Sequence, residues 1–333
     1  MADKVRVAVI GTGQRGPAHA REILKCEETE LALVCDLDEE RAKRASEEFG
    51  ADFALDHRAV VHRNDIDAVS IATHTRHHAG VMRDAAAAGK SFLVEKPYAD
   101  SLATGREICE LAEQNGVVAM VGFQSRFMPF AQQMKALAEQ IDLVQTNVSL
   151  QRGFFNPQYF FPEHYSGILD ALSHTMDLAL WWTGASPVEV MAHEQCGLLK
   201  PDKGAVEFAN ILARCEGGKI VCMTGSMAGV KMQNIFQMAG LRGNISAVDR
   251  GRIRFAKHQG FNEDKSPIDL EEGEWTGEGQ QVMDMWTHFA TCVREGRTDV
   301  APGASLREGL AQVAVSEAAY LSAQEGKAVR LAF

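Results

Sequence analysis

The stretch VRVAVIGTGQRG, residues 5–16, decides the fold of this chain. Val5–Ile10 is an apolar run, interrupted by Arg6, that stops at a glycine, which is typical of a parallel strand buried on both faces. Three glycines then follow at the spacing GxGxxG, and Pro17 agrees with a helix beginning there, because proline is tolerated in a helix's first turn. The stretch predicts a strand, loop and helix that bind the pyrophosphate of a dinucleotide, although a glycine-rich turn without a ligand is the alternative.

A carboxylate supports the dinucleotide. Asp36 ends the predicted second strand, about 20 residues after Gly16, where such folds bind the adenine-ribose hydroxyls. A carboxylate also repels a 2′-phosphate, and the next residues, Leu37 and Asp38, offer no cation, so the sequence favours NAD over NADP. The cofactor contacts predicted here are Gly11, Thr12, Gly13, Gln14, Arg15, Gly16 and Asp36. For Arg15, a solvated helix arginine is an equal alternative.

The composition describes an ordinary globular protein of two domains, since 333 residues exceed the usual single domain. The net charge of −11 argues against nucleic acid or an anionic membrane surface as the main partner. No apolar run reaches the length of a membrane span, and the N-terminus carries no signal-peptide pattern. The seven cysteines are scattered without a CxxC pair, which indicates reduced thiols in the cytoplasm.

The order of predicted elements changes near residue 123. Before it, strands alternate with helices, which predicts a parallel sheet covered on both faces, a nucleotide-binding α/β domain over residues 1–122. Residues 187–256 read as several strands without intervening helices, which favours an antiparallel sheet. We therefore expect an α+β domain over residues 123–333, built on one large sheet, with helices near 279–294 and 304–324.

A polar stripe interrupts the apolar helix predicted for SGILDALSHTMDLALWW, residues 166–182. Its members stand at i, i+3, i+4 and i+7 and are Asp170, Ser173, His174 and Asp177. Asp170 and His174 are one helical turn apart, so a carboxylate can fix the tautomer of the imidazole and raise its basicity. Such a pair suits acid–base chemistry, and a link from the helix to a neighbouring loop is the alternative. For Asp177 we favour a structural hydrogen bond.

A lysine follows another predicted strand in AGKSFLVEKP, residues 88–97. In open α/β sheets, ligands bind at the carboxyl ends of the strands, where Glu95 and Lys96 fall. A lysine there can stabilise a developing alkoxide, whereas spacing alone makes an exposed surface lysine an equal alternative.

The segments around these residues resemble one protein family along nearly the whole chain. The segments are VIGTGQRG, VCDLD, SIATHTRHHAGVMRDAAAAGKSFLVEKP, VGFQSRF and DALSHTMDLALWW. In these segments the chain resembles the glucose-fructose oxidoreductase, inositol dehydrogenase and rhizopine catabolism (Gfo/Idh/MocA) family. The resemblance implies a Rossmann domain and a second domain with a large open-faced sheet. It also implies NAD(P)-dependent oxidation or reduction of a sugar, cyclitol or related polyol. The family's catalytic lysine falls on Lys96, and its active-site aspartate and histidine fall on Asp170 and His174.

The resemblance implies roles for these three residues. His174 accepts the hydroxyl proton of a secondary alcohol, Lys96 hydrogen-bonds the oxygen as charge develops, and Asp170 orients His174 or binds a neighbouring hydroxyl. Departures from the family pattern lie at His74, which replaces a proline, and at Leu172 and Ser166, which replace glycines. They change the shape of the pocket, so the sequence leaves open the substrate, the position oxidised and the direction of the reaction.

Further contacts are predicted more weakly. Candidate cofactor contacts are Thr73, His78, Glu95, Lys96 and Gln124, the last at the passage between the domains; candidate substrate contacts are Arg152, Tyr165 and His174. For Arg126, a structural ion pair is an equal alternative to a ligand contact. The aromatic loop before Tyr165 could pack against a partner subunit instead of lining the pocket. The histidines at 74, 77 and 78 lack a signalled third ligand, so we predict no metal.

Three arginines, Arg250, Arg252 and Arg254, alternate and would share one strand face. A solvated or interface face is one interpretation; if they line the pocket instead, the substrate is anionic. The second-domain sheet is also apolar on both sides in places, which predicts a homodimer or homotetramer through it.

We therefore expect an NAD-dependent dehydrogenase or reductase acting on a small carbohydrate-like molecule. Two alternatives are an NAD-dependent glycoside hydrolase on the same fold, which would not consume added NAD, and a non-catalytic ligand sensor, which need not keep Lys96 and His174.

Overall fold

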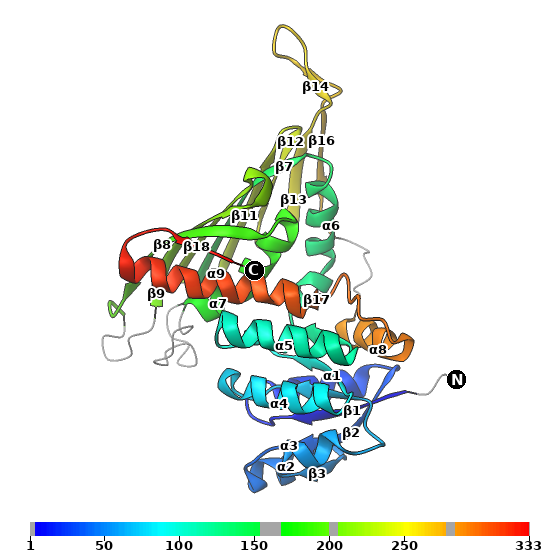
Figure 1. Cartoon of the computed structure of the whole chain (residues 1–333). Coiled ribbons are helices and arrows are strands. Elements are labelled where there is room, and N and C mark those ends of the chain that lie inside the picture. The colour runs from blue at the N-terminus through cyan, green and yellow to red at the C-terminus, as the bar shows by residue number, and fades with distance from the viewer. Residues whose placement is uncertain (1–3, 154–167, 200–205, 278–283, 333) are drawn as a thin grey trace. The chain divides into compact units, whose positions relative to one another are not determined.

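The computed structural model describes residues 4–153, 168–199, 206–277 and 284–332. The chain divides into two compact units: residues 1–127 with 283–313, and residues 128–282 with 314–333 (Figure 1). The first unit therefore takes back a segment from far along the chain, a return that hydrophobic periodicity does not reveal.

The first unit is built on a seven-stranded sheet. Its strands are β1 (Val5–Ile10), β2 (Thr29–Cys35), β3 (Asp52–Ala54), β4 (Ala68–Ile71), β5 (Ser91–Val94), β6 (Ala119–Val121) and β17 (Ala304–Ser305). The strand order is β17-β6-β5-β4-β1-β2-β3, parallel except where β17 pairs antiparallel with β6. The order reverses between β1 and β4, the point at which doubly wound sheets bind dinucleotides. The predicted Rossmann architecture is confirmed.

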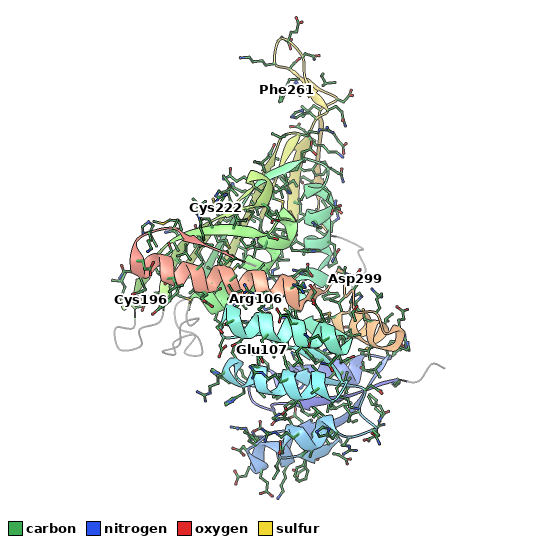
Figure 2. All side chains as sticks on the ribbon, in the orientation of Figure 1. Arg106, Glu107, Cys196, Cys222, Phe261 and Asp299 are labelled. Carbon is green, nitrogen blue, oxygen red and sulfur yellow. The ribbon has the colours of Figure 1, made fainter. Side chains whose placement is uncertain are left out.

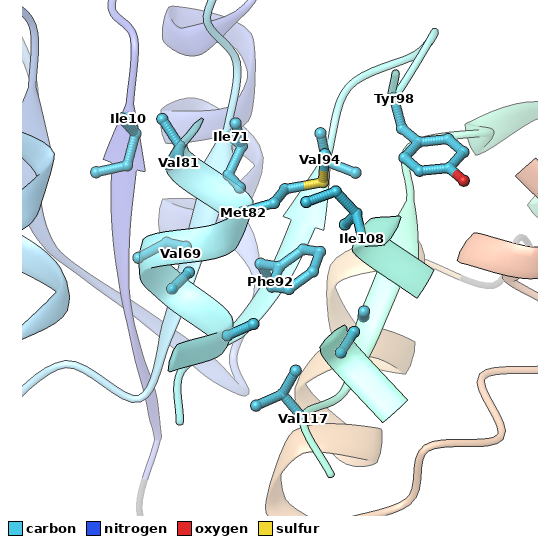
Figure 3. Packing of buried hydrophobic residues seen from close by; sticks show 14 of the residues in the cluster. Ile10, Val69, Ile71, Val81, Met82, Phe92, Val94, Tyr98, Ile108 and Val117 are labelled. Carbon is cyan, nitrogen blue, oxygen red and sulfur yellow. The ribbon is translucent and has the colours of Figure 1, made fainter. Parts of the chain in front are cut away.

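Helices cover both faces of this sheet. They are α1 (Gly16–Lys25), α2 (Glu39–Phe49), α3 (His57–Val61), α4 (Thr75–Ala87), α5 (Leu102–Asn115), the 3₁₀ helix η1 (Gln124–Phe127), α8 (Met285–Glu295) and the beginning of α9 (Leu306–Glu325). The strands contribute to two separate apolar clusters. In one of them, Met82 of α4 and Ile108 of α5 lie beside Phe92 of β5 (Figure 3). Burying such side chains away from water is the main stabilising contribution to the unit.

An ion pair between buried Arg126 and partly exposed Glu308 joins η1 to the returning segment. The Arg126 side chain is 2% exposed, and its Nη1 donates to Glu308 Oε1 at 2.6 Å. Glu308 also accepts from the backbone N–H of Ser305 at 2.9 Å, at the beginning of α9. Of the two interpretations of Arg126, the structure favours the structural ion pair.

The second unit is built on a nine-stranded sheet. Its strands are β7 (Leu143–Gly153), β8 (Pro187–Cys196), β9 (Val206–Cys215), β10 (Ile220–Gly229), β11 (Gln233–Gly240), β12 (Gly243–Val248), β13 (Arg252–Lys257), β16 (Glu271–Trp275) and β18 (Val329–Arg330). The order is β16-β13-β12-β11-β7-β10-β9-β8-β18, and among the described strands of this sheet only β7 and β10 pair in parallel. The large, mostly antiparallel sheet is thus confirmed.

Helices α6 (Pro129–Ala138) and α7 (Ile168–Thr183) cover one face of this sheet, here called the inner face. Trp182 of α7 packs against Phe130 of α6 and Phe236 of β11, with ring centroids 6.1 and 5.4 Å away. Thr183 hydrogen-bonds Thr146 at 2.9 Å. Since Thr146 is near the beginning of β7, the first turns of α7 point toward the other end of the sheet, where β7 reaches Arg152.

A short hairpin extends from this sheet between β13 and β16. Its strands are β14 (Gly260–Phe261) and β15 (Pro267–Ile268), and Phe261 is 60% exposed (Figure 2). Two-residue strands carry too little periodicity to be predicted. None of the described helices is both long and apolar enough to cross a membrane.

Candidate functional site

The three glycines of the loop after β1 differ in how much space surrounds them. A Cβ on Gly11, whose φ is +94°, would lie 2.8 Å from the backbone of Ala72, and one on Gly16 would lie 1.9 Å from Gly11 O. A Cβ on Gly13 would meet nothing within 4 Å. The first and third glycines are therefore required by backbone packing. The second leaves an open approach to the N-terminus of α1, which fits the pyrophosphate of a dinucleotide.

Asp36 is held firmly just after β2. Its Oδ2 accepts from the backbone N–H and the hydroxyl of Thr12 at 2.9 and 3.0 Å, and its Oδ1 accepts from Asp38 N and Arg41 Nη2, both at 3.0 Å. Burial alone would raise the pKa of Asp36, but the hydrogen bonds from Arg41, Asp38 and Thr12 lower it on balance. The carboxylate is therefore ionised and oriented where a ribose would bind. Arg41 is a cation beside Asp36 that could not be found from Leu37 and Asp38, the two residues considered in the sequence.

A buried carboxylate, Glu95, connects the loops after β1 and β5. Its Oε1 accepts from Arg15 Nε at 2.8 Å and contacts His19 Nε2 at 2.9 Å, and the other ring nitrogen of His19 lies 2.7 Å from the Ser70 hydroxyl. Burial alone would raise the pKa of Glu95, but the interactions with His19 and Arg15 outweigh it and hold the pKa well below its usual range. The charge is thus retained inside the protein by its partners.

Lys96 follows directly and is half-buried, with its backbone N–H donating to Glu95 Oε2 at 3.1 Å. The peptide bond between Lys96 and Pro97 is cis. Glu95 therefore orients both the beginning of α1 and the backbone of the candidate catalytic lysine. Neither His19 nor Ser70 was singled out from sequence. The available signal was a histidine on the otherwise apolar face of α1.

His78 connects the loops after β4 and β5. The residue is 1% exposed, with Nδ1 3.2 Å from Pro97 O and Nε2 3.0 Å from Thr73 O. Burial lowers its pKa, so the ring is neutral at pH 7 and donates one N–H to one carbonyl at a time. We infer that His78 positions these loops, and its contact with the cofactor stays a prediction.

The polar stripe on α7 divides by exposure. Ser173 and Asp177 are buried at 0% and 1% exposed, whereas Asp170 and His174 are half-buried. Ser173 Oγ donates to the Asp170 carbonyl at 2.7 Å, a bond within the helix. The two residues predicted to be catalytic are thus the accessible members of the stripe, and the burial of Asp177 agrees with a structural role.

The remaining predicted contacts are distributed over both units. In the first unit, Thr73 is half-buried just after β4, and Gln14 and Gln124 are exposed. In the second unit, Arg152 is half-buried near the end of β7. Tyr165 lies outside the described residues.

Two family models match the chain. Residues 5–123 match the N-terminal domain of Gfo/Idh/MocA proteins, described as an oxidoreductase family with an NAD-binding Rossmann fold. Residues 140–331 match the C-terminal alpha/beta domain of the same family. The two matches agree with the Rossmann sheet of the first unit and the large sheet of the second.

Individual proteins are similar over nearly the full length. A D-apiose dehydrogenase of Paraburkholderia graminis is 27% identical, with 97% of this chain and 89% of that protein covered. A scyllo-inositol 2-dehydrogenase (NAD(+)) of Bacillus subtilis is 28% identical over 90% of this chain and 89% of its own. The crystal structure of an oxidoreductase domain protein from Kribbella flavida shares the fold, with a TM-score of 0.84, 20% identity and coverage of 99% and 100%.

The glycine geometry predicts that one alanine substitution lowers the stability of the protein and that another prevents NAD binding. Gly16→Ala forces a Cβ against the Gly11 carbonyl and should cost about 1–3 kcal/mol or more of unfolding free energy. Gly13→Ala meets no neighbour, so it should leave the melting temperature unchanged but abolish the rise that NAD produces in the wild type. Thermal unfolding with and without NAD measures both effects. A Gly13→Ala protein that keeps the full NAD-dependent rise would contradict this account of the loop.

Glu95 predicts a pH-dependent stability difference. Because its pKa is lower in the folded state than in the unfolded chain, its contribution is complete above the unfolded pKa, about 4.5, and decreases as pH falls through the folded pKa. Glu95→Gln should cost about 3 kcal/mol at pH 7, since it removes a buried carboxylate that accepts from Arg15 and contacts the buried imidazole of His19. The difference between wild type and variant should narrow below about pH 4.5.

Urea unfolding at a series of pH values measures this difference. The matched control is Glu107→Gln, because the Glu107 carboxylate pairs with Arg83 on the surface and is 53% exposed. That control should lose much less stability at pH 7. An equal loss for the two variants, or a Glu95→Gln difference that is independent of pH, would refute the role assigned to Glu95.

Proposed function

Because the chain belongs to the Gfo/Idh/MocA oxidoreductase family, with its NAD-binding Rossmann domain, we propose that it transfers hydride between NAD and a secondary alcohol or ketone of a sugar, cyclitol or related polyol. The observation that carries this proposal is the placement of Lys96, a half-buried lysine just beyond the carboxyl end of β5 whose backbone N–H donates to buried Glu95. The names of the D-apiose and scyllo-inositol dehydrogenases support a carbohydrate-like substrate.

The residues of the first unit would hold the cofactor. Gly13 and the N-terminus of α1 would receive the pyrophosphate, and Asp36 would accept hydrogen bonds from the adenine-ribose hydroxyls. Bound NAD supplies the hydride acceptor in oxidation, and its reduced form supplies the hydride donor in the reverse direction.

The remaining chemistry belongs to side chains of this chain. In oxidation, the His174 imidazole takes the hydroxyl proton, and the Lys96 ammonium donates a hydrogen bond to the oxygen as negative charge develops. Asp170, one turn before His174, orients the imidazole or binds a neighbouring hydroxyl. In reduction, His174 returns the proton to the oxygen.

We expect alanine substitutions at these positions to lower turnover without preventing cofactor binding. Lys96→Ala and His174→Ala should each reduce kcat by about 10²–10⁴-fold, because each removes a group that acts mainly in the transition state. NADH formation across a panel of sugars and cyclitols measures kcat, and NAD-dependent thermal stabilisation measures binding.

Two exposed residues provide matched controls, Lys43→Ala on α2 and His193→Ala on β8, which should keep wild-type turnover. Unchanged turnover in Lys96→Ala and His174→Ala would overturn the proposed roles. Glycoside hydrolysis without net consumption of NAD would identify the hydrolase alternative, and ligand binding without either reaction would identify the sensor.

We also propose that two or four chains associate through the outer face of the nine-stranded sheet, opposite α6 and α7. Three apolar side chains on this face are well exposed: Leu212, Ile220 and Val248, at 48%, 36% and 55%. A broad sheet surface with exposed apolar residues is typical of a subunit interface.

All seven cysteines are free thiols, which supports a reducing compartment such as the cytoplasm.

Association predicts a solution mass of two or four times the 36.4 kDa chain by light scattering after size exclusion. The double variant Leu212→Lys/Val248→Lys places charges on the proposed interface and should shift the protein toward monomer. Leu24→Lys is the control, because Leu24 is also exposed, at 51%, but lies on α1 of the first unit. Wild-type protein that elutes as a monomer would refute the association.

A further inference from the structure

The three alternating arginines near β13 do not share one environment. Arg252 and Arg254 lie within β13, are exposed on the outer face, and pair with Glu274 of β16 at 3.6 and 2.7 Å. Arg250 precedes the strand, in the turn after β12, and takes no part in this ion pair. The alternation that relates the three in sequence therefore ends where the strand ends.

The Arg250 side chain reaches the side of the sheet that the helices cover. Its Nη1 lies 3.1 Å from Met128 Sδ, at the residue that precedes α6. Phe130, in the first turn of α6, packs against inner-face residue Phe236 with 5.2 Å between ring centroids. The guanidinium group of Arg250 is thus directed toward the beginning of α6 and the inner face, away from Glu274.

The strand register brings Arg250 to the end of the sheet that holds Arg152. Asp249 N donates to Asn234 O at 2.6 Å, so the pairing of β12 with β11 continues one residue beyond Val248. On its other side, β11 pairs Gln233 with Gln151 of β7. Arg152 and Arg250 therefore lie at neighbouring levels of the sheet, with only β11 between their strands.

Arg152 continues the inner face of β7. Thr146, Val148 and Leu150 alternate along this strand and are all buried on the inner face, and Arg152 occupies the next position of that series. Burial and the neighbouring charge of Arg152 both lower the pKa of Arg250. Within the part of the chain that the structure describes, no carboxylate lies within ion-pair distance of Arg250. Arg250 is exposed and Arg152 is half-buried, and two neighbouring guanidinium charges raise the local positive potential, which favours the binding of an anion.

We propose that Arg152 and Arg250 form a subsite for an anionic group, and that the substrate is a sugar or polyol derivative carrying a carboxylate or phosphate. The proposal rests on the proposed function and names its substrate class. Guanidinium groups suit this task because their planar donors match carboxylate and phosphate oxygens in bidentate hydrogen bonds.

The subsite lies at the end of the sheet toward which the first turns of α7 point, the turns that carry Asp170 and His174. An anion bound there would orient the rest of the substrate without taking part in proton or hydride transfer. Such an interaction is made equally in the ground state and the transition state, so its loss should raise KM and leave kcat unchanged.

The kinetic test compares matched neutral and anionic substrates at saturating NAD: glucose with glucuronate and glucose 6-phosphate, and galactose with galacturonate. We expect the wild type to prefer an anionic member, and the carboxylate and phosphate arms identify which anion it takes. Arg250→Gln should raise KM for that anion by about tenfold to a hundredfold and leave KM for the neutral sugar within about twofold. Arg252→Gln is the matched control and should keep wild-type values.

A binding test keeps the subsite separate from catalysis. The anionic sugars, at constant ionic strength, should raise the melting temperature of the NAD-loaded wild type and of Arg252→Gln, but not that of Arg250→Gln or Arg152→Gln. Anion-dependent stabilisation without NADH formation from any sugar would refute the proposed function and keep the subsite. Equal stabilisation by neutral and anionic sugars, none from any anionic sugar, or equal losses in Arg250→Gln and Arg252→Gln would overturn the subsite.

Discussion

The buried carboxylate of Glu95 is the constraint on which the arrangement of the first unit depends. An ionised group at 5% exposure is stable only when its partners replace the lost water, so His19 on α1 and Arg15 just before it must remain within reach of the end of β5. The same carboxylate holds the backbone N–H of Lys96. One electrostatic requirement therefore links the loop that fits a dinucleotide to the loop that carries the candidate catalytic ammonium.

The second unit is organised differently, because its antiparallel sheet has one face covered by α6 and α7 and the other face left open by the described helices. Along most of the inner face, apolar packing against α6 and α7 is sufficient, as in the contact of Trp182 with Phe236. At the end reached by Arg152, the apolar series along β7 gives way to a charged side chain. The members of the α7 stripe that remain accessible, Asp170 and His174, belong to the N-terminal turns that point there. Apolar packing and the residues with proposed chemical roles thus occupy opposite ends of one sheet face.

Local patterns predicted what depends on local structure. The glycine loop, the carboxylate at Asp36 and the change from alternating elements to consecutive strands all follow from spacing, and the fold agrees with them. The long-range partners of charged side chains escaped prediction, because Glu308 is 182 positions from Arg126 and Glu95 is 76 from His19. Neither pairing leaves a periodic trace in the sequence, and the same holds for the return of residues 283–313 to the first unit.

Three of the residues with proposed roles, Asp36, Lys96 and Arg250, share a position just outside a strand. Asp36 and Lys96 stand one or two positions beyond the last paired residue of a parallel strand, and Arg250 stands in the turn between two strands. Inside a strand, pairing with the neighbouring strands fixes the backbone, so side chains two positions apart point to the same face of the sheet. Beyond the strand this constraint ends, and the backbone can turn a side chain toward a ligand. Arg250 has the parity of Arg252 and Arg254 but not their environment, since it lies outside the ladder. Parity is therefore evidence about packing within a strand, and at a strand end the register of its neighbours is the better guide to function.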